Sequence, residues 1–423
     1  MSTGARAISV IIPTHNRRAS VCRTLTALAA QSMSPDQFEV IVVADGCADD
    51  TATVLRGLSF PFRLVVLEQK AQGQGMARNV GAGTASASIL VFLDDDVEPL
   101  PGLLEAYEES HRLHPQHLIL GPAIPVLGEE ASLFSQGLRN WWSDHIQAIR
   151  RPSHRFSYRD MHSGNFSISA TLFAQAGRFD REFFGRSGED YEFGIRLLAM
   201  GIPFRVAGGA TAFHHDATDL QRSLVRVRME GRADVLIGVR HPELRKGTAL
   251  TSFRTPRSGL IRILRHLAFH KTRTGDLVAR VLQSALRPLE LIRARRVWRT
   301  VHGAVRSYWY CRGAAEELRC TASSATLEAF LDEAVGREKS LPELDLTDGL
   351  AAAMRTLNHL RPQGVRLRLG GVAVGVIPAI PGAEPVRGDH LPEFLAGEAY
   401  YHLLMALSVN RFRLGTAVEG LAL

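Results

Sequence analysis

Three adjacent aspartates, Asp94, Asp95 and Asp96, directly follow the apolar run 89–93. Because three adjacent negative charges repel one another, the cluster is expected to need a cation. Carboxylates are ligands that hard divalent cations prefer, and such a cation commonly keeps open positions for phosphate oxygens. The pattern therefore favours a metal-assisted site, while a polar loop or a helix N-terminus that attracts acids stays open as the plainer interpretation.

A second acidic pair, Glu189 and Asp190, follows Ser187-Gly188 and opens a predicted helix that ends at Gly201. Acids in a first helical turn usually only complement the helix dipole. Further along, His214 and His215 follow the predicted strand 204–206. A histidine there could bind a metal beside the carboxylates or could be a structural hydrogen-bonding residue.

The glycine-rich stretch 73–83 is a candidate phosphate-binding loop, but it lacks the lysine and the Ser or Thr of a P-loop. Arg78 also stands where the last glycine of G-x-G-x-x-G belongs, which argues against a dinucleotide-binding Rossmann domain. Arg78 itself could bind a phosphate or a base near a metal, or could lie on a helix surface.

The elements that must position these residues alternate along the first third of the chain. Short apolar runs at 8–12, 39–43, 63–67 and 88–93 are typical of buried strands, and helical patterns separate them. Such an alternation predicts a parallel sheet covered by helices on both faces. Ligands of these sheets bind beyond the carboxyl ends of the strands, where residues 14–16, Asp45 and the three aspartates are expected.

Seven motifs occur in the order ISVIIPTHNR, VIVVADGCADDT, GMARNVG, FLDDDVEP, SGNFSIS, GRFDREF and GEDYEFGIRLLAMG, over roughly residues 7–216. This series resembles the family 2 glycosyltransferases. The resemblance implies a GT-A fold, which is an α/β, Rossmann-like arrangement with a mostly parallel sheet flanked by helices. It also implies a bacterial-type inverting enzyme that moves a sugar from a nucleotide-diphospho-sugar donor to a hydroxyl of a saccharide, lipid-linked glycan or natural product.

The resemblance further implies roles at matching positions. Asp190 would be the general base, with Glu189 beside it. Asp96 would bind a divalent cation, Mn²⁺ or Mg²⁺, with His214 as the first choice for an additional ligand and His215 as the alternate. The positions that match donor-binding residues are Pro13, His15, Asp45, Arg78, Asp94, Asp95, Ser163, Gly164 and Asn165.

Two departures from the family pattern leave the donor base open. His15 stands where an aromatic residue is common, and Ala44 replaces the first acid of the usual double-acid motif. Two other function classes also stay open. A nucleotidyltransferase with a related core would release pyrophosphate, whereas a glycosyltransferase would release nucleoside diphosphate. A degenerate sugar-nucleotide-binding or membrane-associated protein would turn over no donor.

A strongly basic region covers residues 254–312, with 14 Lys and Arg residues against two acids, a net +12 compared with +7 for the whole chain. Val297, Val301, Ala304 and Tyr308 form an apolar stripe flanked by arginines, which suits a helix on an anionic membrane surface. An ordinary amphipathic helix packed on the protein explains the same stripe. No recognised motif supports binding to nucleic acid.

The chain is expected to comprise a catalytic domain at 1–220, a basic helical region at 221–320 and a small α+β accessory unit at 321–423, where residues 336–345 are the best linker candidate. Gly370-Gly371 lies between two alternating segments and predicts a hairpin. The N-terminus reads as a first strand and not as a signal peptide, and no apolar run reaches the ~20 residues of a membrane span. A cytoplasmic protein, peripheral on the inner membrane face, is the expectation, with an oligomer left open.

Overall fold

The computed structural model describes residues 6–126, 132–253, 259–321, 326–332 and 340–414. The chain divides into two compact units, the first comprising residues 1–146 and 161–335 and the second residues 147–160 and 336–423. The division into three parts at residues 220 and 320 stays a prediction.

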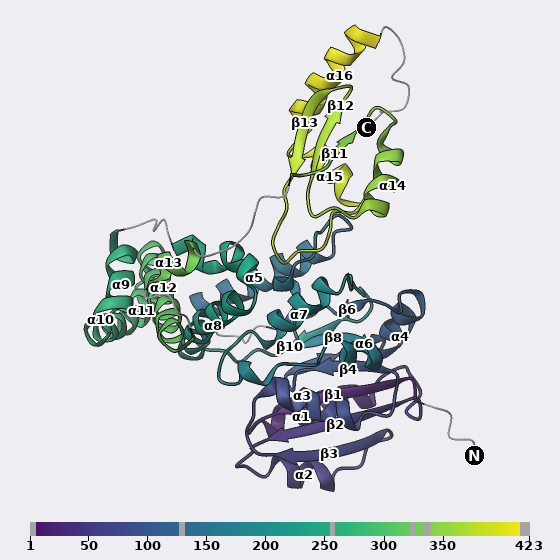
Figure 1. The fold of residues 1–423 in the computed structure, drawn as a ribbon. Coiled ribbons are helices and arrows are strands. Elements are labelled where there is room, and N and C mark those ends of the chain that lie inside the picture. Colours follow the sequence, from purple (N-terminus) through teal and green to yellow (C-terminus); the bar gives the residue numbers. More distant parts are fainter. Residues whose placement is uncertain (1–5, 127–131, 254–258, 322–325, 333–339, 415–423) are drawn as a thin grey trace. The chain divides into compact units, whose positions relative to one another are not determined.

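The first unit is built on a seven-stranded sheet in the order β3-β2-β1-β4-β8-β6-β9 (Figure 1). Strands β1 to β4 are parallel, whereas β8 runs antiparallel between β4 and β6, and β9 is parallel to β6. The predicted α/β fold with a mostly parallel sheet is confirmed, and each of the four predicted strands overlaps an observed one. The strands are β1 (Ile8–Thr14), β2 (Phe38–Asp45), β3 (Arg63–Gln69), β4 (Ile89–Leu93), β6 (Leu118–Leu120), β8 (Asn165–Ser169) and β9 (Phe204–Val206).

Helices cover both faces of this sheet, as fully buried parallel strands require. On one face, α1 (Arg18–Ala29), α2 (Thr51–Gly57) and α4 (Leu103–Leu113) pack on the sheet in one apolar core. On the other face lies α3 (Gln74–Thr84), where a Cβ on Gly81 would collide with the side chain of Ile11. The glycine thus allows α3 to approach the strand closely.

A small three-stranded sheet connects the end of β4 to the histidine region. It contains β5 (Val97–Pro99), β10 (Ala212–His214) and β7 (Ala123–Pro125), with β10 in the middle. Because β10 pairs antiparallel with β5, His214 lies opposite Val97, the residue that follows the three aspartates. The remaining helices before residue 220 are α5 (Leu133–Ile149), α6 (Ala170–Gln175) and α7 (Glu189–Ala199).

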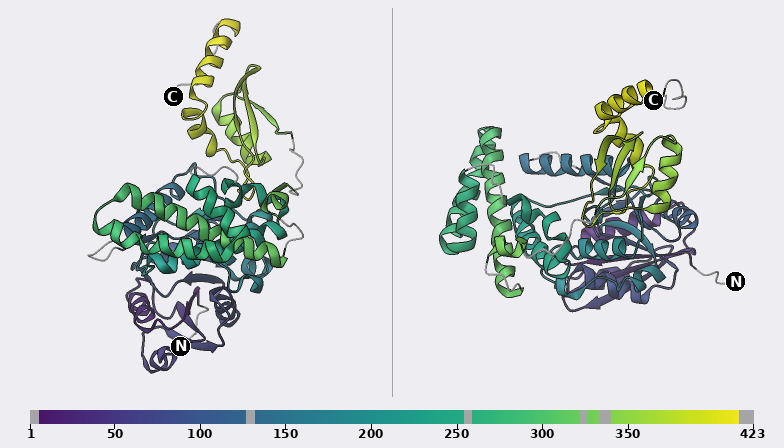
Figure 2. Two further views of the ribbon diagram at one scale, coloured as in Figure 1. Left: turned by 90° about the vertical axis from the view of Figure 1, so that its left-hand side faces the viewer. Right: turned by 45° about the horizontal axis from the view of Figure 1, so that its top comes forward.

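A group of helices follows, in which α12 packs along both α8 and α9 (Figure 2). The backbones of α8 and α12 approach closely, since a Cβ on Gly313 would collide with the carbonyl oxygen of Arg228. Ala304 and Tyr308 are fully buried in the core of this group. Two members of the stripe that suggested a membrane helix are therefore used for internal packing, whereas Val297 is 52% exposed, and contact of this region with a membrane stays a prediction. The helices are α8 (Leu220–Arg240), α9 (Gly259–His270), α10 (Thr272–Ser284), α11 (Leu286–Leu291), α12 (Arg295–Thr321) and α13 (Leu327–Asp332).

The second unit contains a three-stranded sheet and its own apolar core. Gly370 and Gly371 have φ values of 55° and 82° and join β12 to β13 in the predicted hairpin. Two consecutive residues with positive φ are what a two-residue hairpin turn of this kind requires. Four of the predicted linker residues, 336–339, lie outside the described residues. The elements are β11 (Glu343–Asp345), α14 (Leu350–Leu360), β12 (Val365–Leu369), β13 (Val372–Ile377), α15 (His390–Ala396) and α16 (Tyr400–Leu414).

Among the described residues, none of the helices combines the length and the apolar character needed to cross a bilayer.

Candidate active site

The three aspartates after β4 contact two arginines of the same unit. Asp94 accepts a hydrogen bond of 2.6 Å from Nη2 of Arg78. Nη1 of Arg17 donates to both Asp95 and Asp96, at 2.7 and 2.8 Å. The sequence predicted that a divalent cation balances this cluster. Within the described residues two guanidinium groups lie against the carboxylates, and the divalent cation stays a prediction.

The carboxylates of Asp95 and Asp96 differ in their proton affinity. Burial raises the pKa of Asp95 to about 6, although Arg17 and the hydroxyl of Thr14 act in the opposite direction. Burial also acts to raise the pKa of Asp96, but the hydrogen bond and charge of His214, together with Arg17, outweigh it and hold that pKa below its usual value. Asp96 is therefore ionised at neutral pH.

His214 and His215 point to different partners. Nε2 of His214 lies 3.4 Å from Oδ1 of Asp96, and both side chains are largely buried. Nε2 of His215 instead pairs with Glu98 at 2.6 Å. Of the two histidines, His214 is thus the one whose ring reaches the aspartate cluster.

An ionised carboxylate and an imidazole 3.4 Å apart form a donor set that suits Mn²⁺ or Mg²⁺ with additional oxygen ligands. In the part of the chain that the structure describes, no group of three or more His, Cys, Asp or Glu side chains is arranged to hold a metal. Asp96 and His214 are the residues that would hold such a cation, which would need further ligands besides these two side chains. The cation would compete with Arg17 for Asp96.

The second acidic pair lies at the N-terminus of α7. Gly188, with φ of 117°, lets the chain turn into the helix, and Oδ1 of Asp190 accepts a hydrogen bond of 2.8 Å from the amide of Tyr191. Burial, and then the charge of Glu189, raise the pKa of Asp190 to about 7. A carboxylate with this pKa is a competent base near neutral pH.

Arg78 connects the two acidic clusters. Its side chain is fully buried, so the surface-arginine interpretation is wrong. Nη2 contacts Asp94 at 2.6 Å, while Nη1 lies 3.8 Å from Glu189. Its Nε and Nη1 atoms are buried and donate no hydrogen bond to any described residue. Because α3 carries Arg78 to the sheet edge, residues distant in sequence meet around one guanidinium.

The residues expected near the donor base lie at the ends of β1 and β2. Pro13 is buried within β1, and Nδ1 of His15 contacts the carbonyl of Asp45 at 2.6 Å. The carboxylate of Asp45 accepts hydrogen bonds from Gln69 and from the amides of Gln72 and Gly73. Asp45 thus fixes the β3–α3 loop, and its contact with a base stays a prediction.

The segment Ser163, Gly164 and Asn165 lies beside the first aspartate. The amide of Asp94 donates to the carbonyl of Gly164, and a Cβ on this glycine would lie 3.0 Å from Oδ2 of Asp94. Asn165 is buried, accepts from Tyr107 and donates to the carbonyl of Ala210. Ser163 and Gly164 therefore lie near the aspartates, whereas the Asn165 side chain serves internal packing.

A groove of about 330 Å³ opens beside Glu189. Arg222 and Arg226, one helical turn apart on α8, contribute exposed cations, and the charge of Arg226 also acts on Glu230 of the same helix. Phe184 and Val225 contribute apolar surface, with 54% and 56% of each residue exposed. The other lining residues are Gln72, Gly73, Gln74, Gly75, Met76, Asp180, Phe183, Gly185, Arg186, Ser187 and Met229.

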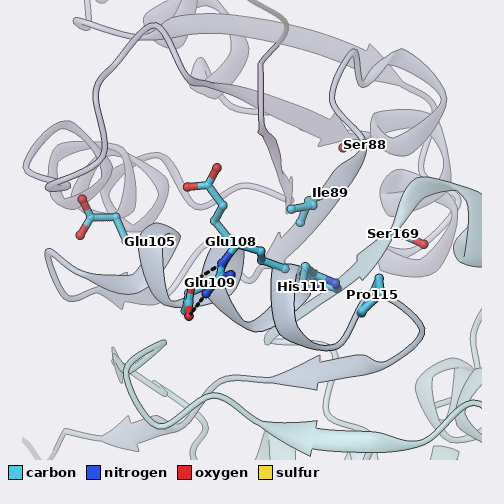
Figure 3. A pocket seen from close by; sticks show the side chains of 9 residues that line it. Ser88, Ile89, Glu105, Glu108, Glu109, His111, Pro115 and Ser169 are labelled. Atoms are coloured by element: carbon cyan, nitrogen blue, oxygen red, sulfur yellow. Dashed lines mark hydrogen bonds and ion pairs between the residues drawn. The ribbon is translucent and has the colours of Figure 1, made fainter.

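Figure 3 shows a larger pocket, of about 600 Å³, which includes Ser88 and Ile89 at the start of β4 and residues of α4 such as Glu108. The three aspartates follow the opposite end of β4. This pocket therefore lies away from the candidate site.

Sequence reasoning missed Arg17 and the aromatic surroundings of His214. Arg17 ends the first motif, ISVIIPTHNR, so its position was a usable signal. Trp142 lies edge-on to His214, with ring centres 6.0 Å apart, and also contacts His162. Trp142 belongs to α5, which the sequence did not predict as a helix.

Known proteins are similar to this chain in sequence and in structure. The family model "Glycosyl transferase family 2" matches residues 9–176. "Validoxylamine A glucosyltransferase" of Streptomyces hygroscopicus subsp. limoneus is 35% identical over 228 residues, which cover 47% of this chain and 49% of that protein. An "Uncharacterized glycosyltransferase" of Haemophilus influenzae is 30% identical over 238 residues, covering 52% of this chain and 76% of the relative.

A solved structure, that of Staphylococcus aureus TarS residues 1–349 in complex with UDP-GlcNAc, aligns with a TM-score of 0.43 and 17% identity, covering 74% of this chain and 91% of the other. The chain spans about half the length of the two validoxylamine A glucosyltransferases that it matches.

Proposed function

The chain belongs to glycosyltransferase family 2, and from this premise we propose that it transfers a sugar from a nucleotide-diphospho-sugar to an acceptor hydroxyl, with inversion and with Asp190 as the general base. The observation that carries the proposal is Arg78, which is fully buried and contacts both Asp94 and Glu189. Through this one side chain Asp94 is linked to Glu189, the neighbour of Asp190, which supports a donor site and a base in the same place.

The chemistry follows from these positions. The acceptor hydroxyl loses its proton to the Asp190 carboxylate while its oxygen bonds to the anomeric carbon. The bond from that carbon to the diphosphate oxygen breaks, and nucleoside diphosphate leaves with the electron pair. Displacement from the face opposite the leaving group inverts the configuration. The pKa of about 7 allows Asp190 to be ionised before the reaction and still basic enough to take a proton.

The leaving diphosphate carries negative charge that the site must balance. Asp96 and His214 would hold the divalent cation, which supplies positive charge to the diphosphate oxygens when bound. Arg17 and Arg78 add guanidinium groups around the aspartates, and the buried Nε and Nη1 atoms of Arg78 donate no hydrogen bond to a described residue. The roles of Pro13, His15, Asp45, Ser163 and Gly164 in holding the donor belong to the same proposal.

The groove beside Glu189 is where we place the acceptor. Its two exposed arginines, Arg222 and Arg226, favour an acceptor that carries a carboxylate or phosphate near the reacting hydroxyl. Phe184 and Val225 offer apolar surface on which a sugar ring or an aglycone can pack.

A product assay tests the proposal. The full chain is incubated with Mn²⁺ and a panel of nucleotide sugars, and the released nucleotide is identified by chromatography. We expect nucleoside diphosphate together with a glycoside of inverted configuration. Pyrophosphate release would instead identify a nucleotidyltransferase, and binding without turnover by any donor would identify a non-catalytic binding protein.

A further inference from the structure

The turn between α11 and α12 exposes large apolar side chains that the described residues leave uncovered. Leu291 and Ile292 are 75% and 72% exposed, and Val297 is 52% exposed. Five exposed arginines surround them within 13 residues. These are Arg287, Arg293, Arg295, Arg296 and Arg299, and we call residues 287–299 the arginine tip.

The fold holds the arginine tip in one place. Arg293, with φ of 56°, turns the chain, and the amide of Ala294 donates back to the carbonyl of Leu289. Trp298 is buried and stacks on His302 with ring centres 4.7 Å apart. The apolar and basic side chains are thus displayed from a structured turn.

The arginines of the tip lack acidic partners among the described residues. The amide of Leu133 donates to Glu290, the acid nearest in sequence, and Tyr308 and Arg312 contact Asp276. By contrast, nearby arginines that serve the fold are paired, as Arg228 with Glu316 and Arg232 with Glu317. The positive charge of the tip is therefore available to an external partner.

The helix that leads to the tip shows a similar surface. Leu277 and Val281, one turn apart on α10, are 65% and 60% exposed, and Arg273 and Arg280 of the same helix are exposed beside them. Of the four residues in the stripe that the sequence offered for membrane contact, only Val297 is part of the arginine tip.

We propose that the arginine tip docks the enzyme on the surface of an anionic lipid bilayer. Anionic headgroups match the unpaired guanidinium groups, and the headgroup–acyl boundary takes Leu291 and Ile292, as for an interfacial segment. A polyanion such as RNA would satisfy the arginines but not these apolar residues. A second copy of the tip would place five arginines against five, so charge disfavours self-association.

Vesicle flotation with the full chain tests this proposal. We expect binding to phosphatidylcholine vesicles that contain phosphatidylglycerol, weak binding to phosphatidylcholine alone, and weaker binding at high salt. Changing Arg295→Gln, Arg296→Gln and Arg299→Gln together should lower the partition coefficient about 100-fold, because each basic residue contributes roughly a factor of five. Leu291→Gln with Ile292→Gln should lower it about tenfold.

Matched controls remove the same groups elsewhere. Arg23→Gln, Arg355→Gln and Arg366→Gln together remove three exposed arginines, and Leu113→Gln with Leu360→Gln remove two exposed leucines. Both controls should bind vesicles as the unchanged protein does, and all variants should keep donor turnover in solution.

Three outcomes would overturn the proposal. These are no binding of the unchanged protein to anionic vesicles, equal losses in tip and control variants, or vesicle binding that is unchanged in the leucine–isoleucine variant. A change of molecular mass by light scattering in the tip variants, without a change in vesicle binding, would assign the surface to self-association instead.

Discussion

In the candidate active site each of the three aspartates contacts an arginine, whereas at the arginine tip none of five exposed arginines has an acidic partner among the described residues. Charged side chains that stabilise the fold thus differ from those that are exposed and accessible to a ligand. Around the aspartates, paired charges fix side chains and adjust their pKa values. At the tip, unpaired charges are accompanied by exposed apolar residues, a combination that costs solubility unless a partner covers it.

Among the candidate active-site residues, the largest effect is expected from substitution of Asp190. Asp190→Asn should lower turnover about 1,000-fold, because it removes the base while retaining an oxygen that can accept from the Tyr191 amide. Donor affinity, measured by calorimetry with Mn²⁺, should stay within about twofold. Undiminished turnover would exclude Asp190 as the base.

The same substitution should change stability in a pH-dependent way. Because the pKa of Asp190 is raised in the folded protein, its ionisation destabilises the fold as pH rises from about 4 towards 7. The free energy of unfolding of Asp190→Asn should therefore be about 1–3 kcal/mol higher than that of the unchanged protein at pH 8. At pH 4 the two proteins should differ little. Equal free energies of unfolding of the variant and the unchanged protein at pH 8, measured in denaturant titrations, would contradict a destabilising ionised carboxylate at Asp190.

Asp96 tests whether the paired cluster also serves a cation. Asp96→Asn should lower turnover about 100-fold at fixed Mn²⁺ and shift the Mn²⁺ titration to higher concentration. Asp50→Asn is a matched control, since Asp50 also contacts an arginine, Arg18, but is exposed. A shift of equal size in both variants would place the cation elsewhere.

The groove beside Glu189 shares a feature with each of the two regions compared. It adjoins the paired charges of the candidate active site, and it carries exposed arginines as the arginine tip does. The unchanged protein should prefer an aryl glucuronide over the corresponding aryl glucoside as acceptor. Arg222→Gln with Arg226→Gln should raise the KM for the charged acceptor about tenfold and leave donor hydrolysis unchanged. Loss of activity on both acceptors alike would contradict charge recognition in the groove.

The smallest effect is expected from Glu189, whose charge is the second contribution to the raised pKa of Asp190 after burial. Below about pH 7, kcat/KM should fall about tenfold per pH unit, since protonation removes the base. Glu189→Gln should move this inflection down by about one unit or less, because burial persists. An inflection that moves upward would show that Glu189 does not repel the ionised base.

Much of the fold was readable locally. The apolar runs of β1, β2 and β4 are continuous because both faces of those strands are buried, and that pattern can be recognised in a single sequence. The Gly370-Gly371 hairpin turn could also be predicted from local sequence, since few other residue pairs adopt two positive φ values. By contrast, β8 was not assigned, and its place between β4 and β6 depends on pairing with β4 residues more than 70 positions away.

The order of residue types along the chain was enough to indicate the family, the fold class and the residues that could do chemistry. Which charges meet depends instead on how segments distant in sequence pack together. Arg17 reaches Asp95 across 78 positions, Arg78 joins Asp94 to Glu189, and His214 rather than His215 faces Asp96. Tertiary packing also buries Tyr308 and leaves Leu291 exposed, since helical periodicity defines a face but not what covers it.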